Sequence, residues 1–400
     1  MKRIIYPSLL LLFVTFSFKT IAQENYWAKP DSLFKFIQPN ASLQLWSVYS
    51  MNEKAQLTTS GPLEPVQDRL NFLARRARVG FKGKPYKSIS YVLNIQFDNL
   101  GKDKYSAVRG STNAGTLGIL DAYMTWRITK NELLNATVGF FQPQFSRECI
   151  TGDLLVNSLD KSVSQSYVRQ HITGKGYGRT TGVNLGGLKK VNLLTFEYNV
   201  GLYDNNSTSS EAETSGFSWS PLTVERLAVT IGDAEKKSYA INYDANNYFN
   251  KRKGVTIAGY SSQQNKSDLF SSNFSTGVDV QFNLKNLNLD GEWNWLQRTR
   301  EGETFKAQTG HIRAGYNVII ANKYFLEPSF MVTNFHGQDG FASTGKDRLY
   351  DIGVNWYLNK KSSKLSLHYI LQEGHGVNGY TNGTTFQKGN YGALAYVIIF

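Results

Sequence analysis

The chain has 400 residues, with 44 Lys and Arg against 31 Asp and Glu, and a single cysteine, Cys149. One cysteine excludes an intramolecular disulfide and a cysteine-based metal cluster. The basic residues are scattered at alternate positions rather than gathered in blocks, which argues against a nucleic-acid partner. The excess of positive charge instead indicates small anions or lipid head groups as partners.

The N-terminus predicts a secretory signal peptide over residues 1–22. Lys2 and Arg3 precede an apolar stretch over residues 4–16, and small residues at 20–22 form a cleavage site. Cleavage would leave 41 basic and 31 acidic residues, a net charge of +10. The alternative is an anchoring helix, for which the apolar run is short, and no later run of about 18 apolar residues predicts a transmembrane helix.

Residues 23–40 read as a periplasmic N-terminal segment with room for one short helix. From residue 41 to the terminal Phe400 the sequence alternates between apolar and polar positions, as in the stretches 41–49, 89–99, 120–128, 194–202 and 350–358. In a membrane barrel such strands turn apolar side chains to lipid and polar side chains to a water-filled interior. The pattern therefore predicts an all-β fold, a transmembrane antiparallel β-barrel over residues 41–400.

Short and long connections alternate along the chain, which is typical of a barrel with short periplasmic turns and long extracellular loops. Short turns are expected at 83–87, 129–132, 187–190, 285–286, 322–323 and 359–363. Long loops are expected at 50–70, 100–117, 143–178, 204–221, 263–273, 336–347 and 373–389. A direct count gives about 17 strands, but a barrel of this kind has an even number. Because residues 222–253 break the alternation, we predict 16 strands, with 18 as the alternative.

Aromatic residues flank many of these turns, where the two membrane interfaces would lie. We expect them to form two girdles, since amphipathic rings favour the lipid–water interface. The residues are Trp46, Tyr49, Trp126, Phe140, Phe141, Tyr248, Phe249, Tyr324, Phe325, Trp356 and Tyr357.

The stretch 71–83 carries the densest positive charge on one predicted strand. Period-2 alternation places Leu73, Val79 and Phe81 toward lipid. The same alternation directs Arg76, Arg78 and Lys82 into the lumen, as it does Arg127 on a later strand. It directs Arg75 outward, near an interface. Two interpretations remain open: an anion pathway lined by these cations, or a wet wall whose charges pair with Asp98, Asp121 and Glu197.

The longest connection, 143–178, is the candidate constriction loop. Long loops in compact folds are usually functional, and one folded into the lumen would narrow it. Folded outward, it would be an extracellular loop. The basic residues that it would bring, together with the one that begins the next strand, are Arg147, Lys161, Arg169, Lys175 and Arg179.

Catalysis has little support, because the five histidines show no His-Glu-x-x-His spacing and no Gly-x-Ser-x-Gly occurs. No metal and no cofactor is predicted. Two other classes remain as alternatives to a channel. One is a non-conducting surface-binding or structural barrel, and the other is a barrel lipase whose Ser and His meet only in space.

Several motifs together resemble one known family. They are residues 75–83 (RRARVGFKG), 120–123 (LDAY), 139–148 (GFFQPQFSRE) and 250–254 (NKRKG), with a terminal aromatic residue. They are similar to the phosphate-selective porin O and P family, in the form common in Bacteroidetes. The resemblance implies a homotrimeric 16-stranded porin of the bacterial outer membrane, with a constricting loop. It also implies an arginine-lined pore for phosphate or polyphosphate, and Arg76 and Arg78 match the family motif. We therefore expect a passive channel for small anions.

Overall fold

The computed structural model describes residues 36–56, 61–110, 117–174, 176–205, 216–321, 323–341, 343–374 and 386–400. The predicted signal peptide, residues 23–35 of the N-terminal segment and Lys175 lie outside these residues. Within them, no helix is both long and apolar enough to cross a membrane.

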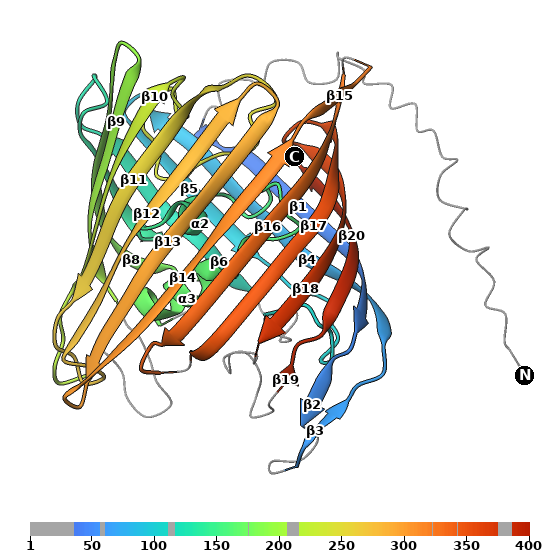
Figure 1. Cartoon of the computed structure of the whole chain (residues 1–400). Coiled ribbons are helices and arrows are strands. Elements are labelled where there is room, and N and C mark those ends of the chain that lie inside the picture. The colour runs from blue at the N-terminus through green and yellow to red at the C-terminus, as the bar shows by residue number, and fades with distance from the viewer. Residues whose placement is uncertain are drawn as a thin grey trace, which may run out of the picture.

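The strands form one antiparallel sheet that closes on itself (Figure 1). Its strands are β1 (Gln38–Met51), β4 (Arg69–Tyr86), β5 (Ile89–Gln96), β6 (Gly118–Arg127), β7 (Asn135–Phe141), β8 (Thr180–Val191), β9 (Leu194–Asp204), β10 (Leu222–Gly232), β11 (Lys253–Gln264), β12 (Ser272–Leu284), β13 (Leu287–Arg300), β14 (Glu303–Tyr316), β15 (Val318–Ile320), β16 (Tyr324–Gln338), β17 (Thr344–Asn359), β18 (Ser363–Gly374) and β20 (Asn390–Ile399). The ring closes because β1 pairs with both β4 and β20. Closure leaves no strand edge unpaired in lipid.

The number of strands in the ring is the predicted 16. The sheet has 17 segments, but β15 continues β14 along the same partner strand, β16. Three short strands form a separate small sheet outside the ring: β2 (Lys54–Gln56), β3 (Leu63–Pro65) and β19 (Phe386–Gln387). In Figure 1 this small sheet lies at the lower end, which we call the loop end, and the short turns lie at the opposite turn end.

Several predicted connections differ from the structure. The turn expected at 83–87 lies mostly inside β4, where Tyr86 still pairs with Ile89. The loop expected at 336–347 is short, because β16 extends to Gln338 and β17 begins at Thr344. The turn expected at 187–190 lies inside β8, and the chain instead reverses at residues 192–193, where Asn192 takes a left-handed φ of 54°. The irregular region 222–253 is one strand, β10, followed by residues 233–252 at the turn end. These residues fold into the barrel, and we call them the turn-end segment. The direct count of about 17 strands was therefore one too high, because a long connection lies at the turn end of the barrel, where the other connections are short.

The predicted assignment of β4 side chains to the lipid-facing and lumen-facing sides is correct at one end of the strand and wrong at the other. Val79 and Phe81 are 48% and 47% exposed on the outer face, as expected, but Leu73 is only 4% exposed and Phe72 is 66% exposed. The cause is a β-bulge: Gln44 pairs with Arg76 and Leu45 with Ala74, so Arg75 is an extra residue. On one side of a bulge, side chains lie on the face opposite to the one that regular alternation predicts. In β4 the reversed residues are those that precede Arg75. Arg75 consequently points inward, not to a membrane interface.

About half of the expected aromatic girdle lies inside the barrel. Tyr49, Trp126 and Trp356 are exposed on the outer face, whereas Trp46, Phe141, Phe249, Phe325 and Tyr357 are buried. Phe249 of the turn-end segment packs edge-on against Phe325 and Tyr357, with ring centroids 5.3 and 4.9 Å apart. These inward rings anchor the turn-end segment to the wall rather than the barrel to the lipid.

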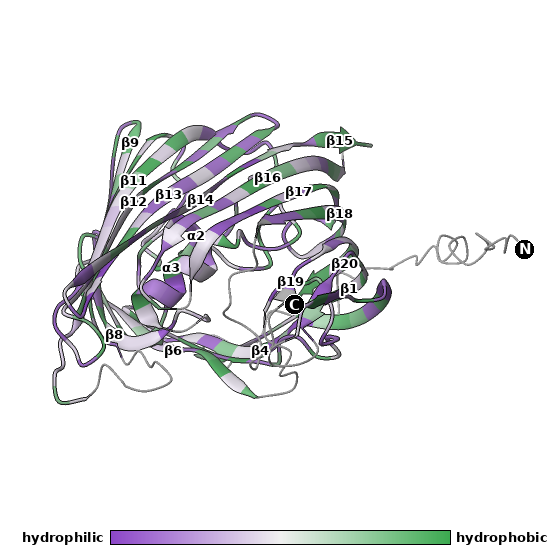
Figure 2. Cartoon of the chain, turned by 60° about the horizontal axis from the view of Figure 1, so that its bottom comes forward, coloured by the Kyte–Doolittle hydropathy of each residue, from purple (hydrophilic) through white to green (hydrophobic). Residues whose placement is uncertain are grey.

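The described residues of the segment 142–178 fold into the barrel and form what we call the lumen loop. It contains α2 (Arg147–Ile150), which is capped by the Ser146 side chain, and α3 (Ser164–Thr173), which ends at Gly174 with a left-handed φ of 66°. Figure 2, viewed toward the loop end, shows both helices inside the ring of strands. The loop thus lies where a constriction would be needed.

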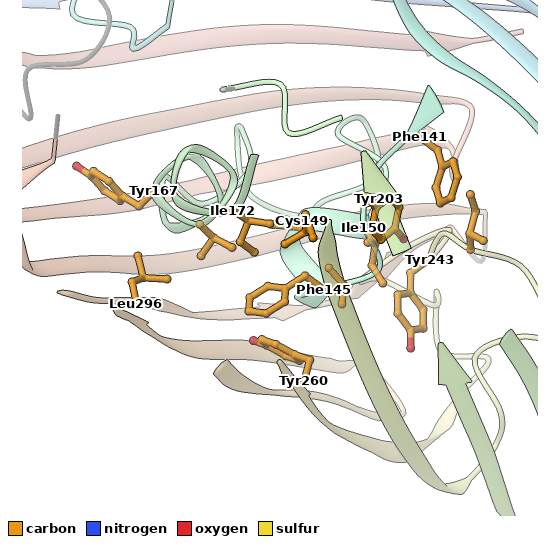
Figure 3. Packing of buried hydrophobic residues seen from close by; sticks show 14 of the residues in the cluster. Phe141, Phe145, Cys149, Ile150, Tyr167, Ile172, Tyr203, Tyr243, Tyr260 and Leu296 are labelled. Atoms are coloured by element: carbon orange, nitrogen blue, oxygen red, sulfur yellow. The ribbon is translucent and has the colours of Figure 1, made fainter. Parts of the chain in front are cut away.

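The lumen loop and the turn-end segment pack against each other inside the barrel. The Tyr243 amide donates to the Ile150 carbonyl at 3.2 Å, and the Gly152 amide donates to the Tyr243 carbonyl at 3.3 Å. Figure 3 shows their apolar side chains, including Phe145 and Ile150, gathered with residues of the wall. The interior of a water-filled membrane barrel is mostly polar, so this internal apolar cluster marks the part of the barrel that is filled with protein.

Candidate functional site

A cavity of about 180 Å³ remains between the lumen loop and the wall formed by β1, β4, β5 and β6. Three arginines line it, so we call it the arginine cavity. Its lining comprises Asn40, Ser42, Arg78, Asn94, Leu120, Asp121, Gln142, Cys149, Ile150, Thr151, Gly152, Asp153, Arg169, Arg179 and Asn242. The residue Asn242 belongs to the turn-end segment, so both inward-folded parts of the chain shape the cavity.

Two of the three arginines reach the cavity from the wall and are held by carboxylates. Arg78 of β4 places Nη2 2.7 Å from Asp98 and 2.8 Å from Asp153. Arg179, immediately before β8, donates Nε to Asp121 at 2.9 Å. Their planar guanidinium groups are thus fixed in orientation, as bidentate recognition of an oxyanion requires.

The third arginine, Arg169, comes from α3 and has only neutral partners among the described residues. Its Nη2 donates to the Gln142 side chain at 2.9 Å and to the Cys149 carbonyl at 2.8 Å, and its buried Nε has no hydrogen-bond partner there. Burial lowers the pKa of Arg169 below its ordinary value. Arginine still stays protonated. Arg169 is therefore a buried positive charge that lacks a bonded counter-ion.

Asp153 is the central acid of the lumen loop. It lies 2.8 Å from Arg78, 3.2 Å from Lys161 and 3.6 Å from Arg76. Burial alone would raise the pKa of Asp153, but Arg78, Lys161 and Arg76 hold it well below its ordinary value. Burial lowers the pKa of Lys161 to about 8, with Asp153 opposing the change. Lys161 can therefore lose its charge in a mildly alkaline medium.

The predicted pathway residues occupy different places in the structure. Arg76, Arg78, Lys161, Arg169 and Arg179 converge on the inner face near the arginine cavity. Lys82 instead lines a groove with Lys84 and Lys87 at the turn end, and Arg127 pairs with Glu132 of the adjoining turn at 3.0 Å. Arg147 is buried between Glu235 and Asp279, away from the cavity lining.

The pairings expected for a wet, charge-balanced wall are also present. Asp98 pairs with Arg78, Asp121 pairs with Arg179, and Glu197 pairs with Lys236. These cations of the wall thus form ion pairs with neighbouring acids. Their role in an anion pathway stays a prediction. Arg169 differs from the other two arginines of the cavity because it forms no ion pair within the described residues, and Asp153 and Glu148 act on it only from a greater distance.

Sequence reasoning missed the role of the turn-end segment and of Gln142, Asn94 and Asn242 in shaping the cavity. It also gave no role to Asp153 and Asp160, which hold the lumen loop to the wall. One signal was available, because the broken alternation over residues 222–253 marks the turn-end segment.

One side-chain group has the outline of a catalytic triad. Ser164 Oγ lies 3.4 Å from His311 Nδ1, and His311 Nε2 lies 3.1 Å from Asp290. All three side chains are buried, and the Arg313 guanidinium lies 3.2 Å from His311 and 2.7 Å from Glu148. The Arg313 cation also occupies the centre where Glu148, Asp290 and His311 could share a metal ion. This group binds the lumen loop to the wall and offers no access to a substrate.

Comparison with solved structures shows the fold. The fold matches OprB of Pseudomonas putida at high pH over 92% of this chain and 95% of that chain, with 9% identity and a TM-score of 0.59. An anion-selective porin from Comamonas acidovorans matches over 91% and 99%, with 10% identity and a TM-score of 0.55. OmpF of Salmonella typhi in complex with daunomycin matches over 91% and 97%, with 10% identity and a TM-score of 0.51.

Comparison of the sequence with curated proteins gives no match. The profile of the family described as phosphate-selective porin O and P, by contrast, matches residues 60–390, most of the chain. With its closed 16-stranded barrel and inward-folded loop, the chain belongs to the phosphate-selective porin O and P family of bacterial outer-membrane proteins.

Proposed function

We propose that this porin is a passive channel for small anions and that the arginine cavity is its selective site, with phosphate as the favoured anion. The observation that carries the proposal is Arg169, a buried cation whose described partners are neutral and whose side chain lines the cavity. An anion in the cavity would supply the missing counter-charge. The printed name of the neighbour from Comamonas acidovorans, an anion-selective porin, agrees with this proposal.

The balance of charges in the cavity suits passage rather than trapping. An arginine–phosphate contact at 4 Å contributes about 4 kcal/mol at an effective dielectric constant near 20. Asp121 and Asp153 also line the cavity and weaken anion binding by repulsion. Conduction needs sites of moderate affinity, because a single tight site would hold the ion. The amides of Asn94 and Gln142 supply neutral donors for the remaining oxygens of phosphate.

Planar-bilayer recording tests the proposal. We expect a reversal potential that shows anion selectivity, and block of the chloride current by low-millimolar phosphate. Arg169→Gln should weaken both, because it removes the unbalanced charge while keeping a hydrogen-bond donor. Arg300→Gln, at an exposed position paired with Glu301, is the matched control. Cation selectivity in the wild type would refute the proposal.

Arg169 is a cleaner target than Arg76 and Arg78, although the family motif includes the latter two. Their removal would release Asp153 and Asp160 and so loosen the lumen loop itself. A change in current in that double variant would mix the loss of charge with the movement of the loop.

The second candidate is a non-conducting barrel, which the protein-filled part of the lumen favours. The same bilayer experiment decides between them, since such a barrel would give no channel currents. We also propose that the chain forms a homotrimer, on the basis of its family. Native mass spectrometry of the detergent-solubilised protein tests this directly.

A further inference from the structure

The outer surface formed by β11, β12, β13, β14 and β16 has a hollow of about 400 Å³ with a mostly apolar lining. This wall faces the viewer in Figure 1. The outward side chains around the hollow are Ile257, Val278, Val280, Trp293, Ile312 and Val332. On a regular barrel wall, outward side chains would fill this space. The hollow therefore follows from the kind of residues that stand at these positions.

Two glycines create the hollow. A Cβ added at Gly310 would lie 2.2 Å from the Glu292 carbonyl oxygen, and one at Gly291 would lie 2.8 Å from the His311 carbonyl oxygen. Gly310 pairs with Trp293, and Gly291 pairs with Ile312, so bulky side chains border each gap. The close approach of the strands thus keeps the floor of the hollow free of side chains.

A basic edge lies next to the hollow on the same outer face, toward the loop end. Lys346 and Arg348 of β17 are exposed and alternate with the buried Asp347 and Leu349. Exposed His336 of β16 pairs with Lys346, and exposed Lys306 lies on β14.

Cross-strand pairs connect this edge directly to the hollow. Arg348 pairs with Asn334, and Asn334 pairs with Gly310. Among the described residues, the one acid that pairs with the edge is Glu373, opposite Arg348. The edge therefore remains positively charged where it meets the apolar belt.

We propose that this wall binds a membrane lipid with an anionic phosphate head group, whose acyl chain fills the hollow and whose phosphate meets Lys346 and Arg348. Lipid chains are as apolar as the side chains around the hollow, so specific binding in a membrane needs close packing and polar contacts together. The hollow provides the packing, and the basic edge provides the charge complementarity. The proposal does not depend on which ions pass through the lumen.

Native mass spectrometry of the full chain in detergent tests the proposal, with phosphatidylglycerol and phosphatidylcholine of identical acyl chains as probes. We expect phosphatidylglycerol to be retained at least about fivefold more, the effect of one basic residue at an anionic surface. The triple variant Lys306→Gln, Lys346→Gln and Arg348→Gln should abolish this preference. The matched control changes three exposed lysines at the turn end, Lys189, Lys190 and Lys285, to Gln.

A second variant tests the hollow. Val332→Trp should fill it and lower retention of both lipids, whereas Val200→Trp, at an outward position on β9, should not. Unchanged heat-modifiable mobility on a gel shows that each variant is folded.

Three results would overturn the proposal. Equal retention of the two lipids would remove the role of charge. Displacement of phosphatidylglycerol by millimolar inorganic phosphate would show a site for the free ion. Dissociation of the oligomer by Val332→Trp, with lipid retention unchanged, would show that a second copy of the chain covers the hollow.

Discussion

Arg75 and Arg76 are consecutive in the sequence, yet both bind Asp160 of the lumen loop. Arg75 Nη2 lies 2.7 Å from one carboxylate oxygen, and Arg76 Nη2 lies 2.6 Å from the other. Neighbouring residues of a regular strand point to opposite faces, so this contact requires the β-bulge at Arg75. Without the bulge, only Arg76 would point inward. With it, Arg75 and Arg76 both point inward and form what we call the clamp, the pair of arginines that holds Asp160 of the lumen loop.

The bulge predicts which residues of β4 contact lipid. A spin label at Phe72→Cys should be accessible to oxygen dissolved in lipid, because Phe72 is exposed on the outer face. A label at Leu73→Cys should be shielded. The only native cysteine, Cys149, is buried and does not compete for the reagent. The opposite pattern of accessibility would place β4 in a regular register without a bulge.

Loss of the Asp160 carboxylate should loosen the lumen loop and raise anion selectivity. Asp160→Asn leaves the mostly buried Arg75 without an ion-pair partner among the described residues and Arg76 with only Asp153, 3.6 Å away, at a cost of about 2–3 kcal/mol, below the range for fully buried pairs. Bilayer recording should show noisier currents and a reversal potential shifted toward the anion limit. Asp103→Asn, which breaks a more exposed pair with Arg69, should change neither. Quiet currents with unchanged selectivity would count against the clamp.

Anion selectivity should fall as the pH rises from 7 to 9. Burial lowers the pKa of Lys161 to about 8, so this cation of the lumen loop loses its charge in that interval. Lys161→Met should remove this step in the reversal potential. A step of the same size in the variant would assign it to another group.

The lowered pKa of Lys161 also determines whether this residue makes the folded protein more or less stable as the pH rises. Folded Lys161 releases its proton near pH 8, while the unfolded side chain keeps it up to about pH 10.5. Between these values the unfolded state binds more protons, so the contribution of Lys161 to the free energy of unfolding rises with pH. Thermal unfolding of wild type and Lys161→Met across this window measures it.

Removal of the Tyr243 side chain should separate the two parts of the chain that fill the lumen. Its ring lies 4.2 Å from the Arg147 guanidinium and 4.0 Å from the Lys236 ammonium, and it is buried in the internal apolar cluster. Tyr243→Ala should cost about 3 kcal/mol in lost packing. We expect faster proteolysis within the turn-end segment and a larger single-channel current. Tyr86→Ala, at an exposed ring, is the control.

The sequence alone determined the architecture of this protein. Alternation of apolar and polar residues follows from the geometry of single strands, and the requirement that a membrane sheet close on itself set an even number of strands. The outward positions of Val79 and Phe81 follow from these local rules. The family resemblance also came from the sequence, and two of its motifs, 75–83 and 120–123, lie wholly within strands.

Only the tertiary structure decided what fills the lumen and which charges remain unbalanced. Asp153 and Asp160 reach Arg76 and Arg78 across about 80 residues of chain, a separation at which sequence periodicity carries no information. A single bulged residue reversed the face of Leu73, because strand parity depends on counting every residue. The lack of an ion pair at Arg169 is likewise a property of the packed lumen, where its hydrogen-bond partners are the Gln142 side chain and the Cys149 carbonyl.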